Sequence, residues 1–475
     1  MPRESSFLRL PAVLIILLLL AVLSVQHETA VVMIRDSRGE RVGIEEAFRK
    51  HREVMGEKRS SDGESIRLSK CLRFDEKSAV IEKLPTTGIQ IVHTGSLECS
   101  SSHESICDFV KSLKPDLNYT VAACTDGSEP SSFRMSSAGT DVSMVRAEAG
   151  LGAYRSVLKY PPNDPLFSEQ RDYFRALGIR QTWKAVRRSG LPRRDVVVAI
   201  LDSGITPGHP EFEGKVLEGF DASGAWRKSV EDHFGHGTAM VGIIASNTNN
   251  GVGIAGIADK VLVRPIRMSE KGTEAAFERV VRAWEAALTF ADTDIILYSA
   301  GGWFDQDRSI FYKLVLEQAV KNGILVLTSA PNSDNVDGPE EVELPCALAH
   351  GISGVLCIAA TVTSHPLTAL GDATKLASLG MPATNVSYPT PIRDGDVWRY
   401  AKGQGSSVAA AAAAGIAVLI KSFKNFTPQE IERILLNSTE GRVRTKAGDE
   451  MSYGVLRPDV AIKQAIAEAS WARVA

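Results

Sequence analysis

Gly403–Leu419 reads GQGSSVAAAAAAGIAVL, and the interpretation of the rest of the chain starts from this stretch. A glycine-rich turn carries two serines and leads directly into a run of helix-forming residues, Val408–Ala414. Small residues at a helix start allow a serine on a tight turn to expose its hydroxyl. Backbone N–H groups and the positive end of the helix then face the place where an oxyanion would form. The stretch therefore predicts a nucleophilic serine at a helix start.

Such a serine needs a base and an orienting carboxylate from elsewhere in the chain. Asp202 ends the apolar run of VVVAILDSG (196–204), and His236 lies in GHGTAMVGIIA (235–245). Ser407, His236 and Asp202 are the candidate nucleophile, general base and orienting acid. Each has a plain structural alternative, namely a serine that caps a helix, a histidine in a turn, and an aspartate that caps a turn.

Three short motifs carry a family resemblance: Asp202-Ser203-Gly204, His236-Gly237-Thr238 and the GSSVA of 405–409. In this order they resemble the subtilisin-type (subtilase) serine peptidases, and the resemblance extends from Asn163 to Ile466. It implies an α/β fold whose mostly parallel sheet has helices on both faces. It also implies a serine endopeptidase that hydrolyses polypeptides through an acyl-enzyme and an Asp-His-Ser triad, without a catalytic cofactor.

The resemblance assigns further site residues. Asn332 in TSAPNSDN corresponds to the oxyanion-hole asparagine, and Ser299, Ala300 and Gly301 in YSAGG correspond to the substrate-binding segment. It selects Ser407 rather than the neighbouring serine as the nucleophile, because the family usually has threonine at the preceding position.

Two departures from the family pattern bear on activity. Pro331 precedes Asn332 where the family usually has glycine, and proline fixes φ and removes an N–H. After the nucleophile, Val408–Ala412 (VAAAA) replaces the usual Met-Ala-Ser-Pro-His. The second departure keeps open an alternative function, a catalytically inactive homologue that binds peptides or acts as a surface glycoprotein.

A structural calcium site is a further expectation from the resemblance. Glu211 occupies a place where the family often has an aspartate ligand, and the loop NTNNGVGI (247–254) resembles a family calcium loop that would add Asn250. Calcium takes six to eight oxygen ligands, of which these residues supply only a few. The alternative is a plain Asn/Gly turn.

The loop from Asp334 to Glu343 is acidic. If it borders the pocket for the residue that supplies the scissile carbonyl, basic side chains would be favoured there. The alternative is an acidic loop that is simply solvated.

Composition narrows the class of protein. Of the 475 residues, 44% are hydrophobic, which is enough apolar content for a large core. The formal net charge is −3. No excess of basic residues argues for a nucleic-acid partner.

The N-terminus predicts a secretory signal peptide at residues 1–26, because two arginines precede an apolar run of only about 16 residues, Leu10–Val25. An uncleaved signal anchor is the alternative. After signal removal no membrane association is expected, and the protein would be secreted or reside in a secretory compartment.

Six cysteines fit an oxidising compartment, although their spacing leaves the pairing open: Cys71, Cys99, Cys107, Cys124, Cys346 and Cys357. Four N-x-[ST] sequons predict a glycoprotein, at Asn118, Asn385, Asn425 and Asn437.

The domain prediction has three further parts. By position and size, residues 27–130 resemble a subtilase prodomain, a small α+β unit that would inhibit the enzyme; an unrelated accessory domain is the alternative. Residues 131–162 are predicted as a linker that contains the maturation site, since this stretch is rich in small and polar residues. Residues 163–475 form the predicted catalytic domain.

Hydrophobic patterning predicts alternating strands and helices in the catalytic part. The expected strands are 196–201, 261–266, 294–298, 324–327 and 354–361. The expected helices are 236–245, 274–289, 310–320, 408–423 and one from Thr427 with a capping box to Glu430. In the N-terminal part, 28–64 is charged with a short helical pattern at 44–51, strands are expected at 87–93 and 119–123, and a helix at 103–113.

Overall fold

The computed structural model describes residues 28–35, 41–43, 46, 80–94, 120–126, 130–132, 142–146, 156–223, 228–269, 274–332, 343–371, 376–445 and 448–471. The predicted signal peptide lies outside these ranges. The chain divides into two compact units, Met1–Ser128 and Glu129–Ala475. None of the helices in the described ranges has both the length and the apolar content that crossing a bilayer requires.

The first unit contains an antiparallel sheet of five strands. Its strands are β1 (Glu28–Arg35), β2 (Arg41–Val42), β3 (Val80–Lys83), β4 (Gln90–Thr94) and β5 (Thr120–Asp126). The strands expected at 87–93 and 119–123 are found as β4 and β5. The expected helix at 103–113 lies outside the described residues, and so does almost all of 44–51.

The sequence prediction missed β1, which pairs with both β4 and β5 and is central to this sheet. Its middle residues, Ala30–Met33, are buried. A short apolar run that is buried on both faces shows no alternation, and the charges on either side of this run concealed it.

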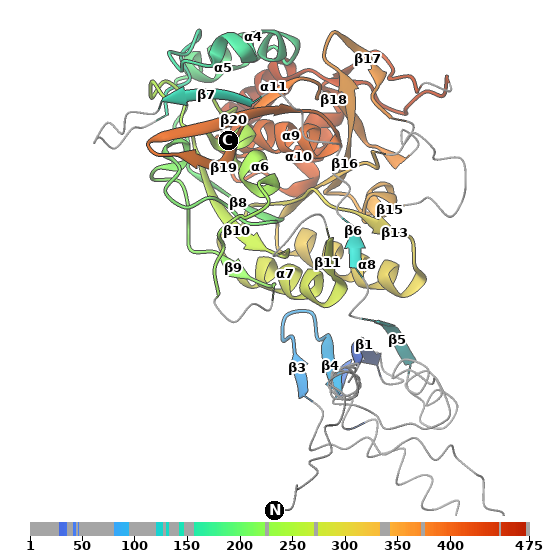
Figure 1. Ribbon diagram of the computed structural model, residues 1–475. Coiled ribbons are helices and arrows are strands. Elements are labelled where there is room, and N and C mark those ends of the chain that lie inside the picture. The colour runs from blue at the N-terminus through green and yellow to red at the C-terminus, as the bar shows by residue number, and fades with distance from the viewer. Residues whose placement is uncertain are drawn as a thin grey trace, which may run out of the picture. The chain divides into compact units, whose positions relative to one another are not determined.

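A ten-stranded, mostly parallel sheet forms the centre of the second unit (Figure 1). The spatial order is β21-β22-β18-β16-β14-β12-β8-β10-β9, with β17 paired to β16. The strands are β8 (Val196–Asp202), β9 (Phe220–Asp221), β10 (Val261–Arg267), β12 (Ile295–Tyr298), β14 (Leu325–Ser329), β16 (Val355–Val362), β17 (His365–Ala369), β18 (Leu379–Pro382), β21 (Thr439–Glu440) and β22 (Val455–Leu456). All seven residues of β8 are buried, as expected for a strand covered on both faces.

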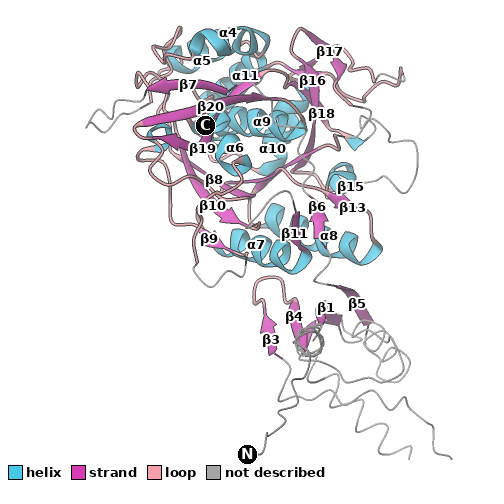
Figure 2. Ribbon diagram, in the orientation of Figure 1, coloured by secondary structure: helices cyan, strands magenta, loops and turns pink. Residues whose placement is uncertain are grey.

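Helices cover both faces of this sheet (Figure 2). Helices α6 and α9 pack together on one face, and α7 and α8 pack together on the other. The helices of the unit are α4 (Phe167–Ala176), α5 (Ile179–Arg188), α6 (His236–Ala245), α7 (Phe277–Thr289), α8 (Gln306–Lys321), α9 (Ser406–Lys421), α10 (Pro428–Asn437) and α11 (Pro458–Trp471). The predicted α/β class with a mostly parallel sheet is confirmed, and so is the capping box between Thr427 and Glu430.

Every residue of α9 is buried, so the alanine-rich tract runs through the middle of the core. Small side chains allow the helix to approach the strands and the neighbouring α6 closely. At Gly415, an added Cβ would lie 2.9 Å from Ile257 side-chain atoms. The tract therefore has a packing role besides carrying the two serines.

Two parts of the predicted linker pair with strands of the second unit, so this stretch is not a linker throughout. Strand β6 (Pro130–Ser132) pairs antiparallel with β11 (Glu274–Ala276) and contacts β13 (Gly302–Trp303). Strand β7 (Val142–Arg146) extends the hairpin of β19 (Val386–Asp394) and β20 (Val397–Gly403). Backbone pairing needs no apolar side chains, which explains why composition did not reveal it. The same pairing makes the first three residues of the helix expected at 274–289 a strand.

Candidate active site

The carboxyl end of β8 supplies the candidate acid. Asp202 is the last residue of the strand, and its Oδ1 accepts a hydrogen bond of 2.7 Å from the Ser203 N–H. Gly204 follows with φ of +113°, and a Cβ there would lie 2.4 Å from the Val230 carbonyl oxygen. The Asp-Ser-Gly turn therefore requires glycine for both its conformation and its packing.

The amino end of α6 supplies the candidate base. His236 is the first helical residue and follows Gly235, which has φ of +103°. A Cβ on Gly237 would lie 2.1 Å from the Gly204 carbonyl oxygen, so the two turns meet backbone to backbone. This contact brings the His236 Nδ1 to 2.7 and 2.8 Å from the two carboxylate oxygens of Asp202.

A second carboxylate, Asp232, fixes the turn that carries the histidine. Its Oδ1 accepts hydrogen bonds from the Ser203 hydroxyl and from the Phe234 and Gly235 N–H groups, at 2.7–3.0 Å. Its Oδ2 accepts from both the N–H and the hydroxyl of Thr238, at 2.9 and 2.7 Å. The sequence analysis did not single out this residue, although an aspartate shortly before a Gly-His-Gly turn is a recognisable loop-capping signal. His233, in the same loop, is exposed.

Opposing effects act on the imidazole of His236, which is 3% exposed. Burial disfavours the charged form, but the charge of Asp202, its hydrogen bond and the charge of Asp232 together raise the pKa of His236 above its ordinary value. Among the described residues the His236 Nε2 has no hydrogen-bond partner. The ring is therefore held at Nδ1 and made more basic.

The amino end of α9 supplies the candidate nucleophile. Gly405, with φ of +128°, precedes the helix, and Ser407 is its second residue. Ser407 and His236 line the same small hollow, which is partly open to solvent. The Ser407 hydroxyl donates to the Ser299 carbonyl oxygen at 3.2 Å rather than to the imidazole. The His236 Nε2 accepts no hydrogen bond from this hydroxyl, and such catalytic hydrogen bonds are often long or poorly aligned before substrate binds.

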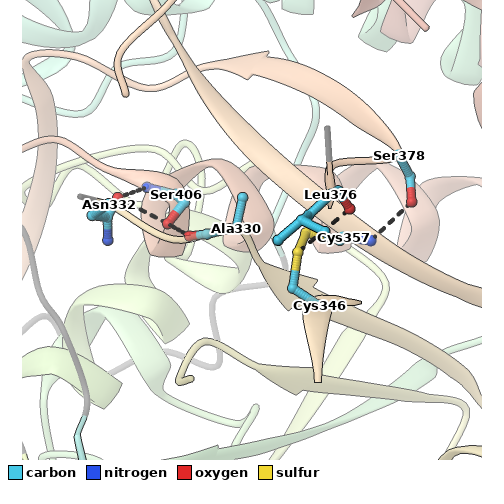
Figure 3. Close-up of a disulfide and its surroundings, with 7 residues drawn as sticks. All are labelled: Ala330, Asn332, Cys346, Cys357, Leu376, Ser378 and Ser406. Carbon is cyan, nitrogen blue, oxygen red and sulfur yellow. Dashed lines mark hydrogen bonds between the residues drawn. A yellow bond between two sulfur atoms is a disulfide. The ribbon is translucent and has the colours of Figure 1, made fainter. Parts of the chain in front are cut away.

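Asn332 lies beside the nucleophile turn (Figure 3). Its Oδ1 accepts hydrogen bonds from the N–H and the hydroxyl of Ser406, at 2.8 and 2.9 Å. The Ser406 hydroxyl is also bonded to the Ala330 carbonyl oxygen. Because its carbonyl oxygen is committed to Ser406, the amide of Asn332 is oriented with its NH₂ group away from that contact. Pro331 does not prevent this placement.

The proposed substrate segment Ser299–Gly301 follows β12 directly. It leads into β13, which pairs antiparallel with β15 (Glu343–Leu344). Shortly after β15, a disulfide joins Cys346 to Cys357 of β16 (Figure 3). Cys71, Cys99 and Cys107 lie outside the described residues.

The two candidate calcium ligands lie in one region, where Glu211 is buried and Asn250 is half-buried. Glu211 is fully buried; its Oε1 accepts from the Ile254 N–H at 2.7 Å and the Tyr400 hydroxyl at 3.0 Å, and its Oε2 has no partner among the described residues. Asn250 accepts from the Val252 N–H through its side-chain oxygen at 2.9 Å.

A second carboxylate, Asp164, bonds the N–H groups of Asn249 and Asn250 in this region. Burial raises the pKa of Asp164 to about 6, and burial together with the charge of Asp164 raises the pKa of Glu211. Two buried carboxylates and an unpartnered oxygen fit an oxygen-preferring cation. In the part of the chain that the structure describes, no group of three or more His, Cys, Asp or Glu side chains is placed to hold a metal ion.

The structure thus brings Asp202, His236, Ser407 and Asn332 to one site, from the ends of two strands and the starts of two helices. Ser299, Ala300 and Gly301 border it through the contact between Ser299 and Ser407. Glu211 and Asn250 lie in the separate region just described.

Comparison with known proteins identifies relatives of this chain. The model described as "Subtilase family" matches residues 193–455, which is more than half of the sequence. The major intracellular serine protease of Bacillus subtilis (strain 168) is 30% identical over 241 residues, covering 50% of this chain and 71% of that protein. Thermitase from Thermoactinomyces vulgaris is 27% identical over 272 residues, covering 55% of this chain and 86% of that protein.

Solved structures give the same architecture. Fervidolysin from Fervidobacterium pennivorans superposes with a TM-score of 0.62 at 16% identity, covering 92% of this chain and 61% of that chain. The A-subunit of the AB5 toxin from E. coli superposes with a TM-score of 0.51 at 22% identity, covering 62% of this chain and 99% of that chain. At such identities the similarity concerns the fold alone.

Proposed function

Because the chain belongs to the subtilase family of serine peptidases, we propose that it is a secreted endopeptidase in which Ser407, His236 and Asp202 form the catalytic triad. Subtilases are serine-type hydrolases of polypeptides and need no catalytic cofactor. The observation that carries the proposal is the bond from His236 Nδ1 to Asp202, in a histidine that lines the same hollow as Ser407 and whose Nε2 has no hydrogen-bond partner among the described residues.

In the proposed mechanism the Ser407 hydroxyl turns from the Ser299 carbonyl to the His236 Nε2 and attacks the scissile carbonyl carbon. The imidazole takes the hydroxyl proton as the new C–O bond forms, and Asp202 stabilises the resulting imidazolium. Collapse of the tetrahedral intermediate breaks the C–N bond, and the imidazolium gives its proton to the leaving amine. Water then attacks the acyl-enzyme by the same proton transfers and releases the second product.

The oxyanion would bind at the amino end of α9. The Ser407 backbone N–H lies in the first turn of the helix, where N–H groups have no partner within the helix. The NH₂ group of Asn332 is the second proposed donor, oriented by the two hydrogen bonds from Ser406. Each such donor lowers the barrier by roughly 3–4 kcal/mol.

A fluorophosphonate probe tests the proposal directly, because it labels only a serine activated by its base. We expect labelling of the mature protein, abolished in Ser407→Ala and retained in the exposed-loop control Ser364→Ala. Unchanged labelling in Ser407→Ala, in protein that still unfolds cooperatively, would contradict the assignment.

An inactive peptide-binding homologue is the second candidate. It is favoured by the Ser407 hydroxyl, which bonds the Ser299 carbonyl rather than the imidazole, and by the altered tract Val408–Ala412. Absence of both labelling and peptide hydrolysis, together with retained peptide binding, would select it.

We further propose that the first unit is a prodomain that inhibits the enzyme and is removed by self-cleavage. The pairing of β6 with β11, and its contact with β13, support a substrate-like path for the chain beside Ser299–Gly301. The asparagines of three sequons are exposed, which supports the proposed secretion and glycosylation: Asn385, Asn425 and Asn437. Expression in a secreting host should yield a shortened chain, whereas Ser407→Ala should accumulate the uncleaved one.

A structural calcium ion is proposed beside Glu211, with oxygens of Asn250 and Asp164 as further ligands. When bound, the ion would neutralise the two buried carboxylates. Chelation by EDTA should therefore lower the melting temperature of the mature protein, and added calcium should restore it. A melting temperature that responds to neither treatment would exclude the site.

A further inference from the structure

The small hollow beside the candidate nucleophile has walls from four elements. Its lining includes Met240 of α6, Tyr388 of β19, Gly403 of β20 and Val408 of α9, together with His236 and Ser407. Strand β19 packs against α6 (Figure 1), and a Cβ on Gly242 would lie 2.1 Å from the Pro389 Cδ. The hollow is therefore bounded by the β19–β20 hairpin on one side and by the starts of two helices on the other.

This hollow lies on the leaving-group side of the proposed site. The acyl part of a substrate would pair with 299–301, and its oxyanion would bind at Asn332; these residues follow β12 and β14 rather than the elements that form the hollow. In the proposed mechanism His236 gives its proton to the leaving amine. The first residue of the leaving peptide must then lie next to His236 and Ser407, both of which line the hollow.

Two strands of the chain itself indicate the same direction. Strand β6 pairs with β11 and contacts β13, on the side of segment 299–301. Strand β7, which follows β6 in the chain, pairs with β20 and places Val142 opposite Ala401, two residues before Gly403. A substrate bound in the same direction would extend its leaving part along β20, past the hollow.

The walls restrict both the size and the charge of an occupant. The hollow has room for little more than one water molecule. Met240, Tyr388 and Val408 are buried, and a Cβ on Gly403 would lie 2.7 Å from the Tyr388 Cε1, so that ring lies directly against the β20 backbone. Among the described residues that line the hollow, none is Asp, Glu, Lys or Arg. A charged side chain would therefore lose water there without gaining an ionic partner.

We propose that this hollow binds the side chain of the residue that supplies the scissile nitrogen (P1′), and that Met240 and Val408 restrict P1′ to small uncharged residues such as alanine and serine. The proposal rests on the proposed function and specifies its substrate class. A longer side chain must displace a wall of the hollow or leave it for solvent.

Internally quenched peptides that differ only at P1′ (Ala, Ser, Leu, Lys and Asp) test this specificity. Enzyme concentrations are set by fluorophosphonate titration, and mass spectrometry confirms that the same bond is cleaved. For the wild type we expect kcat/KM to be higher for Ala and Ser than for Leu by at least about tenfold, the range expected when a side chain exceeds an apolar pocket, and lower again for Lys and Asp.

Widening the hollow should relax this preference. Val408→Ala should raise the ratio of kcat/KM for the Leu peptide to that for the Ala peptide by about tenfold. Met240→Ala widens the opposite wall and should change the ratio in the same direction. Val418→Ala is the matched control, because it makes the same truncation at a buried position of the same helix, two turns or more beyond the hollow, and should leave the ratio unchanged.

The outcomes separate this inference from the proposed function. A wild type that is labelled and cleaves the Leu peptide as well as the Ala peptide would overturn the inference and leave the proposed function intact. Equal changes of the ratio in Val408→Ala and Val418→Ala would also overturn it, because general loosening of the core would then explain both. A wild type that is not labelled at all would reject the proposed function itself.

Discussion

The two halves of the candidate site are held with very different firmness. In the histidine half (Asp202, Asp232 and His236), Asp232 alone accepts five hydrogen bonds. The turn after Asp202 and the turn that carries His236 meet where Gly237 lies against the Gly204 carbonyl oxygen. In the serine half (Ser299, Asn332, Ser406 and Ser407), the Ser407 hydroxyl donates its hydrogen bond to the Ser299 carbonyl oxygen rather than to the imidazole.

This difference indicates where substrate acts on the enzyme. The histidine half is oriented before substrate arrives, because its carboxylates are buried and fully engaged. In the serine half, a substrate backbone that pairs with Ser299–Gly301 would compete for the Ser299 carbonyl and release the Ser407 hydroxyl toward the imidazole. The departures from the family pattern, Pro331 and Val408–Ala412, also lie in the serine half.

Asp202→Asn should produce the largest effect. The amide keeps the shape of the side chain but favours the wrong imidazole tautomer, so kcat should fall by about 10⁴-fold. Single-turnover hydrolysis of a peptide ester measures it. Asp195→Asn, at an exposed carboxylate before the same strand, is the control. A loss below tenfold would show that the histidine half does not need its buried acid.

Asn332→Ala should come next. Removing the proposed oxyanion donor should lower kcat by about 10²–10³-fold with little change in KM, because the contact forms only as the oxyanion develops. Steady-state kinetics with one peptide separates the two parameters. A raised KM with kcat unchanged would instead assign Asn332 to binding of the substrate ground state.

Patterning predicted the five neighbouring strands β16, β14, β12, β8 and β10 of the second unit's sheet because they contain apolar runs, as in Val196–Leu201, and it missed the other five strands. It failed where pairing depends on backbone rather than side chains. Strand β11 was predicted as the first turn of a helix, and β6 and β7 were predicted as linker. Neither the amino-acid composition nor the hydrophobic periodicity indicates which backbone segments pair.

The site shows the same limit. Motifs led to Asp202, His236 and Ser407 because each lies in a short signature with glycines that its turn requires, and the family resemblance led to Asn332. Asp232 and Ser406 were missed as supports, since their importance lies in hydrogen bonds to residues distant in sequence, such as Ser203 and Asn332.

Asp232→Asn should have a smaller and pH-dependent effect. The charge of Asp232 helps to raise the pKa of His236, and the imidazole must be neutral to act as a base. Removing that charge lowers this pKa, so the acid limb of kcat/KM should move to lower pH.

The amide of this variant can accept through one oxygen only, so the melting temperature should also fall. Glu231→Gln, at the neighbouring exposed carboxylate, should leave the acid limb in place. An acid limb that does not move in a folded Asp232→Asn enzyme would reduce Asp232 to a purely structural support.

Ser406→Ala should have the smallest effect on kcat. It tests how strongly the Ser406 hydroxyl contributes to the orientation of Asn332 in the serine half. It removes the hydroxyl bonds to Asn332 and to the Ala330 carbonyl but keeps the backbone N–H bond to Asn332 at 2.8 Å. Losing part of this support should lower kcat by roughly 3–10-fold, the amount expected for one neutral hydrogen bond. Ser406→Thr restores a hydroxyl and should recover the rate. If Ser406→Ala were as damaging as Asn332→Ala, the amide would depend entirely on that hydroxyl, and the serine half would be as strictly organised as the histidine half.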